Sequence, residues 1–180
     1  PAPKYPFPVD EAKAAVGAPL FAQHCAGCHG LGVPGSKVGT VTDISVIQTD
    51  RHRLDSFTEG LVERFHSIDE PPFVFGAYRK TNGYSNLPID APWARASYLH
   101  NGSVPTLWDL LQPPANRPQR FWRGGNLYDP TRVGFVTTQG NGNDFLFETG
   151  SPGNGNEGHE FGTALSDDEK WALIEYLKTM

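Results

Sequence analysis

A single five-residue motif constrains this chain more than any other feature. Residues 25–29 read CAGCH, and Cys25 and Cys28 are the only two cysteines among 180 residues. Two thiols at this spacing can reach both vinyl groups on one edge of a porphyrin, and the next residue, His29, then projects over the ring face. The pattern therefore predicts one covalently attached haem c, held by Cys25 and Cys28, with His29 as an axial ligand of the iron.

Two other chemistries use a close cysteine pair. A thioredoxin-like redox pair should lie near a βαβ pattern, which this sequence does not show. A zinc site needs two further ligands at regular spacing, and there is no second cysteine pair. With only two cysteines, a disulfide framework and a four-cysteine iron–sulfur cluster are excluded as well.

The composition favours one domain with short helices and long loops. The 20 glycines and 16 prolines interrupt regular structure often. The formal net charge is −5, with scattered lysines and arginines, which argues against nucleic-acid binding. No apolar stretch approaches the roughly 20 residues that span a bilayer. Residues 1–8 are proline-rich and are expected to form an extended segment or a linker, followed by a single monohaem domain over residues 9–180.

The residue patterns predict a mainly α fold. Helices are expected after Asp10, interrupted near Gly17 and Pro19, and then at 55–66 and 106–111. A final helix is indicated by a capping box of Ser166 and Glu169 followed by an apolar stripe. Segments 133–138 and 145–149 flank a GNGND sequence and predict one small β-hairpin.

The chain also resembles known families. The order of helix, CAGCH, long loops and a terminal LSDDEKWALIEYLKTM helix resembles class I cytochrome c domains. The segment WARASYLHNGSVPTLWDLL (93–111) is similar to the haem domains of bacterial di-haem cytochrome c peroxidases and of the related rubber oxygenases. TDRHRLDSF (49–57), RGGNLYDP (123–130) and GNGNEGHEFGTALS (153–166) resemble the rubber-oxygenase-like members.

This resemblance carries several expectations. It implies a cytochrome c-like fold with long loops and, because such haems are attached outside the cytoplasm, a periplasmic or secreted protein. The relatives carry two haems, whereas this chain has a single C-x-x-C-H motif. Catalysis between two haems therefore cannot occur within this chain alone.

The second axial ligand of the iron largely decides function. His159 is preferred, because it lies in the loop before the last helix, where class I cytochromes c carry their distal methionine. Gly158 is expected to let that loop approach the porphyrin. His100 is the runner-up, with a hydrogen bond to backbone or to a haem propionate as its alternative role. Met180 is disfavoured because it is the last residue of the chain.

Ligation by His29 and His159 favours ferric iron and predicts a lower reduction potential than His/Met ligation gives. The leading hypothesis is single-electron transfer with a redox partner protein or a fused redox domain, and no residue is assigned a catalytic role. One rival is a haem enzyme of peroxidase or oxygenase type with a displaceable distal ligand. The other is a sensor or structural haem module fused to another domain.

Overall fold

The computed structural model describes residues 3–139 and 142–180. Its helices are α1 (Glu11–His24), α2 (Ala26–His29), α3 (Ile44–Ile47), α4 (His52–Ser56), α5 (Glu59–His66), η1 (Pro92–Arg95), α6 (Leu107–Leu110), η2 (Pro114–Asn116) and α7 (Asp167–Lys178). Its strands are β1 (Val41–Asp43), β2 (Asp69–Glu70), β3 (Phe73–Val74), β4 (Gly83–Ser85), β5 (Arg120–Arg123), β6 (Tyr128–Asp129), β7 (Gly134–Phe135) and β8 (Phe145–Glu148).

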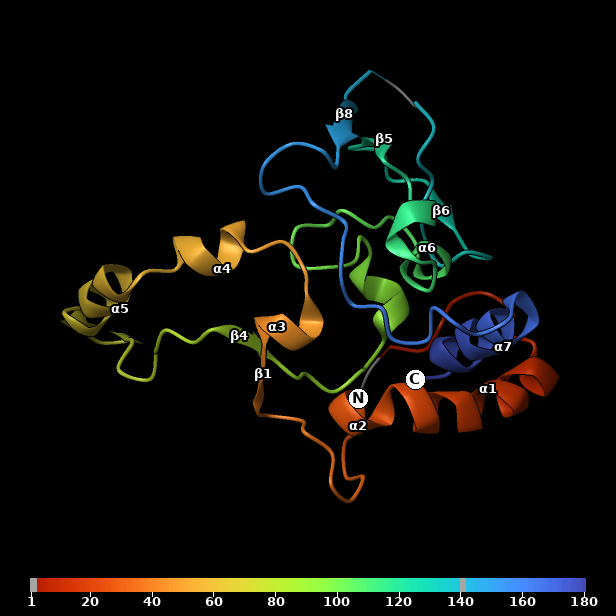
Figure 1. The fold of residues 1–180 in the computed structure, drawn as a ribbon, viewed down its shortest axis with the longest axis horizontal. Helices are drawn as coiled ribbons and strands as arrows, with labels where there is room; N and C mark the ends of the chain where they lie inside the picture. The colour runs from red at the N-terminus through yellow and green to blue at the C-terminus, as the bar shows by residue number, and fades with distance from the viewer. Residues whose placement is uncertain (1–2, 140–141) are drawn as a thin grey trace.

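The first and last long helices, α1 and α7, pack against each other (Figure 1). Asp10 caps α1 by accepting a hydrogen bond from the amide of Lys13, and the helix continues through Pro19 without a break. Helix α7 has the expected capping box, in which Ser166 and Glu169 bond each other's backbone amides. The two helices at the chain ends thus form the frame to which the other segments attach.

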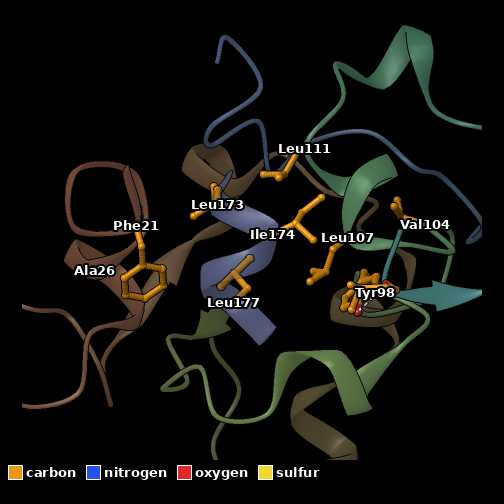
Figure 2. Packing of buried hydrophobic residues seen from close by; sticks show 10 residues of the cluster. Phe21, Ala26, Tyr98, Val104, Leu107, Leu111, Leu173, Ile174 and Leu177 are labelled. Carbon is orange, nitrogen blue, oxygen red and sulfur yellow. Dashed lines mark hydrogen bonds between the residues drawn. The ribbon is translucent and has the colours of Figure 1, made fainter. Parts of the chain in front are cut away.

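The hydrophobic core is centred on the buried face of α7. Leu173 and Ile174 are fully buried, and Phe21 of α1 packs in the same cluster. Leu107 lies in α6 and Leu111 follows its last residue. Both extend the cluster on the side of α7 away from Phe21 (Figure 2). The short helix predicted over 106–111 is therefore confirmed, and its N-cap is Thr106.

The prediction of a mainly α fold is wrong. Helices make up 33% of the structure and strands 13%. The strands form small two-stranded antiparallel sheets, with pairs β1–β4, β2–β3, β5–β8 and β6–β7. Two of these sheets, β1–β4 and β5–β8, join segments that are far apart in the chain, and such long-range pairing leaves no periodic signal in a local window of sequence.

The predicted β-hairpin is also wrong. Strand β8 pairs with β5, in the register Phe121 to Phe147 and Trp122 to Leu146. Segment 133–138 contributes β7, which pairs instead with β6. The turn that would close the predicted hairpin includes residues 140–141, which lie outside the described residues.

A long arm carries α4 and α5 away from the rest of the fold (Figure 1). The helix expected over 55–66 ends at His66 as predicted, but it begins only at Glu59 because Thr58 caps α5. Phe57 and Phe65 stack at 6.4 Å between ring centres and belong to a small aromatic cluster on the arm.

The N-terminal segment has no helix or strand from residue 3 to residue 9. Residues 1 and 2 of the predicted extended segment lie outside the described residues. Tyr5 contacts the ring of Trp93 and donates a hydrogen bond to the carbonyl of Pro130, so this part of the segment packs on the fold. Among the described residues, no helix is both long and apolar enough to cross a membrane.

Candidate haem-binding site

The CAGCH motif forms the single helical turn that follows α1. The carbonyl of Cys25 accepts hydrogen bonds from the amides of Cys28, at 3.1 Å, and His29, at 2.9 Å. Residues three and four apart on a helix lie on the same side. The turn therefore presents both free thiols and the imidazole to one region of the structure.

The thiol of Cys25 differs from that of a redox-active cysteine. Burial, with a smaller contribution from the neighbouring Cys28, raises the pKa of Cys25 to about 11. Reactive pairs of the thioredoxin type instead have thiols with a lowered pKa. Among the described residues there is also no group of three or more His, Cys, Asp or Glu side chains able to hold a metal ion. The raised pKa of Cys25 therefore argues against a redox pair of the thioredoxin type.

The imidazole of His29 is fixed by the backbone of a distant segment. Its Nδ1 lies 2.7 Å from the carbonyl oxygen of Leu87, just beyond strand β4. Because a carbonyl only accepts, Nδ1 is the donor in this hydrogen bond, and Nε2 is therefore the nitrogen that the neutral ring would offer to a metal. A histidine that binds a metal through one nitrogen usually donates from the other in this way.

His159 lies across from His29. The two ring centres are 6.3 Å apart and the ring planes are inclined by 46°. A transition metal lies about 2 Å from a bound imidazole nitrogen, and that nitrogen lies about 1.2 Å from its ring centre, so two imidazoles on opposite sides of one metal have centres roughly 6.4 Å apart. The observed separation fits one metal ion between the two rings.

The state of the His159 ring also suits metal binding. Burial, followed by the nearby His29 and Arg117, lowers the pKa of His159 to about 4, so the imidazole is neutral near pH 7. Only a neutral imidazole can act as a metal ligand. Its Nδ1 is buried and has no hydrogen-bond partner among the described residues. Such an atom usually has a partner, so the ring fits a site completed by a bound group.

Apolar side chains are exposed in the segments that hold the two histidines. Leu87, whose carbonyl binds His29, is 57% exposed, and Val46, next to the residue that binds the His159 amide, is also 57% exposed. Phe161 is 39% exposed and its ring meets that of His159 at 5.2 Å. A porphyrin is large, flat and mostly apolar, and one held between these segments would cover apolar side chains of this kind.

Gly158 allows a close contact between two segments of the polypeptide. A Cβ at this position would lie 2.4 Å from the backbone carbon of Gln48 and 2.5 Å from the carbonyl oxygen of Ile47. Its φ of +76° also favours glycine. Glycine is thus required here by the close approach of the loop to the end of α3, and the approach to a porphyrin that the sequence suggests stays a prediction.

The other ligand candidates lie in different surroundings. The ring of His100 stacks on Tyr84, with centres 5.1 Å apart, and burial lowers its pKa. Its Nε2 is buried without a partner among the described residues. Met180 packs, partly buried, against the hydrophobic core. Among the three candidates for the second iron ligand, His159, His100 and Met180, His159 is the one whose ring lies next to that of His29.

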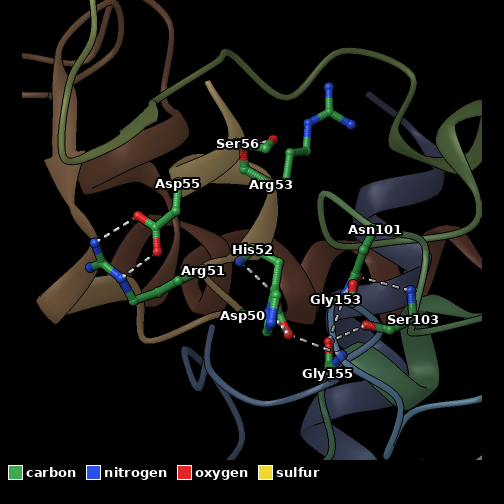
Figure 3. Close-up of polar contacts among 10 residues, drawn as sticks. All are labelled: Asp50, Arg51, His52, Arg53, Asp55, Ser56, Asn101, Ser103, Gly153 and Gly155. Atoms are coloured by element: carbon green, nitrogen blue, oxygen red, sulfur yellow. Dashed lines mark hydrogen bonds and ion pairs between the residues drawn. The ribbon is translucent and has the colours of Figure 1, made fainter. Parts of the chain in front are cut away.

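A polar cluster holds the loop that leads to His159 (Figure 3). The carboxylate of Asp50, 7% exposed, accepts hydrogen bonds from the amide of His52 at 2.8 Å and the amide of Gly155 at 3.4 Å. The carbonyl of Gly155 in turn accepts from Asn101 at 2.8 Å and from Ser103 at 2.9 Å. This cluster cannot be predicted from the sequence, because its members are far apart in the chain and share no motif.

Replacing Asp50 with alanine is expected to lower the free energy of unfolding by about 2 kcal/mol near neutral pH, because buried amides lose a charged acceptor. Burial alone would raise the pKa of Asp50, but the hydrogen bonds from His52 bring it below its ordinary value. The ionised carboxylate therefore stabilises the fold above the unfolded-state pKa of about 3.9, and this contribution is lost as the pH falls through the lower folded-state pKa.

Urea denaturation at several pH values measures this effect. Asp55→Ala is the matched control, since Asp55 forms an exposed ion pair with Arg51 that is expected to contribute less than about 1 kcal/mol. Equal losses for the two variants near neutral pH, or a difference that grows on acidification, would contradict the role given to Asp50.

Comparison with protein families supports a haem protein. A family model described as RoxA-like, cytochrome c-like matches residues 83–123. The match confirms the resemblance to cytochrome c-like domains that the sequence indicates, and its segment includes Leu87 and His100. The comparison thus assigns this part of the chain a cytochrome c-like, haem-binding character.

Two proteins of Sinorhizobium fredii are similar to this chain. The uncharacterized protein y4iJ is 48% identical over 106 residues, which is 54% of this chain and 18% of y4iJ. The uncharacterized protein y4iM is 35% identical over 153 residues, which is 73% of this chain and 35% of y4iM. The chain therefore corresponds to only part of the length of each relative.

Proposed function

We propose that this chain is a monohaem c-type cytochrome domain that transfers single electrons. In this proposal Cys25 and Cys28 hold one haem c covalently, and His29 and His159 are its two axial ligands. The observation that carries the proposal is the 6.3 Å separation between the two imidazole centres, combined with the hydrogen bond that leaves Nε2 of His29 free. When bound, the haem supplies one-electron chemistry through its iron.

The residues of the chain would control ligation and access. Leu87 orients His29 through the bond to Nδ1. The amide of His159 donates to the carbonyl of Ile47 at 2.7 Å, which holds the opposite ring in place. Two imidazoles held in this way would bind the iron and keep water and small ligands from it, which favours electron transfer over an enzyme that needs an open site.

The partner and the compartment are part of the same proposal. We infer a periplasmic or secreted location, because haem c is attached outside the cytoplasm. We infer a redox partner that is either a separate protein or another domain of a longer polypeptide, which the partial coverage of both relatives supports.

Spectroscopy of the His159→Ala variant tests the distal ligand. The ferric parent chain, produced with a haem-attachment system, is expected to give low-spin bis-imidazole absorption and magnetic resonance signals. His159→Ala should lose them and bind cyanide rapidly, whereas the control His100→Ala should keep them. His159→Met should raise the reduction potential, because thioether ligation favours ferrous iron more than imidazole does.

Two outcomes would contradict the proposal in different ways. Bis-imidazole signals that persist in His159→Ala would show that another residue is the distal ligand. A high-spin signal or fast cyanide binding in the parent chain would instead favour a haem enzyme with an open site.

A further inference from the structure

The side chain of Arg117 lies fully inside the protein, next to the loop that carries His159. It is 2% exposed, and among the described residues no carboxylate forms an ion pair with it. A buried guanidinium has a large desolvation cost unless its donors are satisfied. Such a residue is expected to have a specific role in the surrounding structure.

The guanidinium satisfies its donors with backbone carbonyls from two segments. From the end of α6 it reaches Gln112, with Nε at 3.0 Å, and Leu110, with Nη2 at 3.3 Å. From the His159 loop it reaches Asn156 and Gly158 through Nη1, the latter at 2.9 Å, and the His159 carbonyl through Nη2 at 3.5 Å. Arg117 therefore ties the loop to the end of a helix in the core.

The same loop is also held by α3. The amide of His159 donates to Ile47, and Gly158 packs directly against the backbone of residues 47–49. His159 itself has a φ of +48°, a conformation that costs free energy for a residue with a side chain. The loop thus needs its contacts with Arg117 and with α3 to keep the His159 imidazole where it is.

We propose that Arg117 is a positioning residue for His159, which holds the imidazole against the haem iron and contributes a fixed buried positive charge beside it. This inference rests on the proposed function, in which His159 is the distal ligand. A positive charge near the iron favours the ferrous form, so Arg117 raises the reduction potential. The fork geometry of the guanidinium holds the loop, and its charge adjusts the potential.

Two substitutions separate these contributions. Arg117→Met removes charge and hydrogen bonds, and should both speed cyanide binding to the ferric protein and lower the reduction potential. Arg117→Lys keeps a positive charge but cannot span carbonyls of two segments, so it should speed cyanide binding while its potential stays near that of the parent. The expected acceleration is about tenfold or more, the factor that corresponds to losing one or two hydrogen bonds.

A nearby surface arginine provides the matched control. Arg120 forms an exposed ion pair with Glu148, and Arg120→Met should leave both cyanide binding and potential unchanged. If Arg117→Met does not fold with haem, the rate of cyanide binding to ferric Arg117→Lys is sufficient to test the positioning role. Parent-like cyanide rates in the Arg117 variants that fold would overturn the inference, even where those variants are less stable.

The His159→Ala variant, measured in parallel, separates the two proposals. If it loses the bis-imidazole signals while the Arg117 variants behave like the parent, only the inference about Arg117 fails. If it keeps those signals, the distal assignment fails and the role of Arg117 fails with it.

Discussion

A chain in which Cys25 and Cys28 are both replaced with serine is expected to release its haem completely on denaturation, whereas the parent chain retains it. Thioether bonds survive unfolding, but bonds between imidazole and iron do not, because they need the folded site to hold both histidines in place. Haem staining of a denaturing gel and the mass of the intact chain measure the difference. The effect is all or none.

Single substitutions and a control make this test specific. Cys25→Ser and Cys28→Ser should each retain haem through the remaining thiol, and His100→Ala should retain it through both. Haem that stays with the denatured double variant would mean attachment at another residue. A parent chain that is colourless, with the mass of the bare polypeptide, would refute covalent attachment altogether.

The parts of the site that could be predicted are those encoded in short stretches of sequence. The CAGCH motif specifies its own helical turn, because residues three and four apart share a helix side. The place of His159 before the terminal helix predicts it as the second iron ligand. The capping box of Ser166 and Glu169 marks the start of that helix. The structure brings His159 and His29 together, although haem ligation itself stays a prediction.

The parts that could not be predicted depend on contacts between distant segments. Leu87 acts through its carbonyl, which every residue has, so its side chain gave no signal. Arg117 stands in a proline-rich stretch that looks like surface loop, and only the folded chain shows its carbonyl partners. The sheets β1–β4 and β5–β8 have the same origin, since each pairs strands that are far apart in the chain.

Replacing Gly17 with alanine is expected to lower the free energy of unfolding by about 3 kcal/mol, because α1 and α7 are in backbone contact there. A Cβ at Gly17 would lie 2.1 Å from the carbonyl oxygen of Ala172 and 2.9 Å from the Cβ of Tyr176. Neither atom is the end of a flexible side chain, so the two helices would have to move apart. Denaturant unfolding of the parent and the variant measures the loss.

Gly60, near the start of α5, is the matched control because a Cβ there would meet nothing within 4 Å. Alanine has the higher helix propensity, so Gly60→Ala should be neutral or stabilising by up to about 1 kcal/mol. The same propensity gain acts at Gly17, so a loss there measures the close contact of the helices and not helix formation. Since α1 leads directly into Cys25, separation of the helices should also displace the haem-attachment turn. Equal stability of the two variants would show that α1 and α7 do not meet at Gly17.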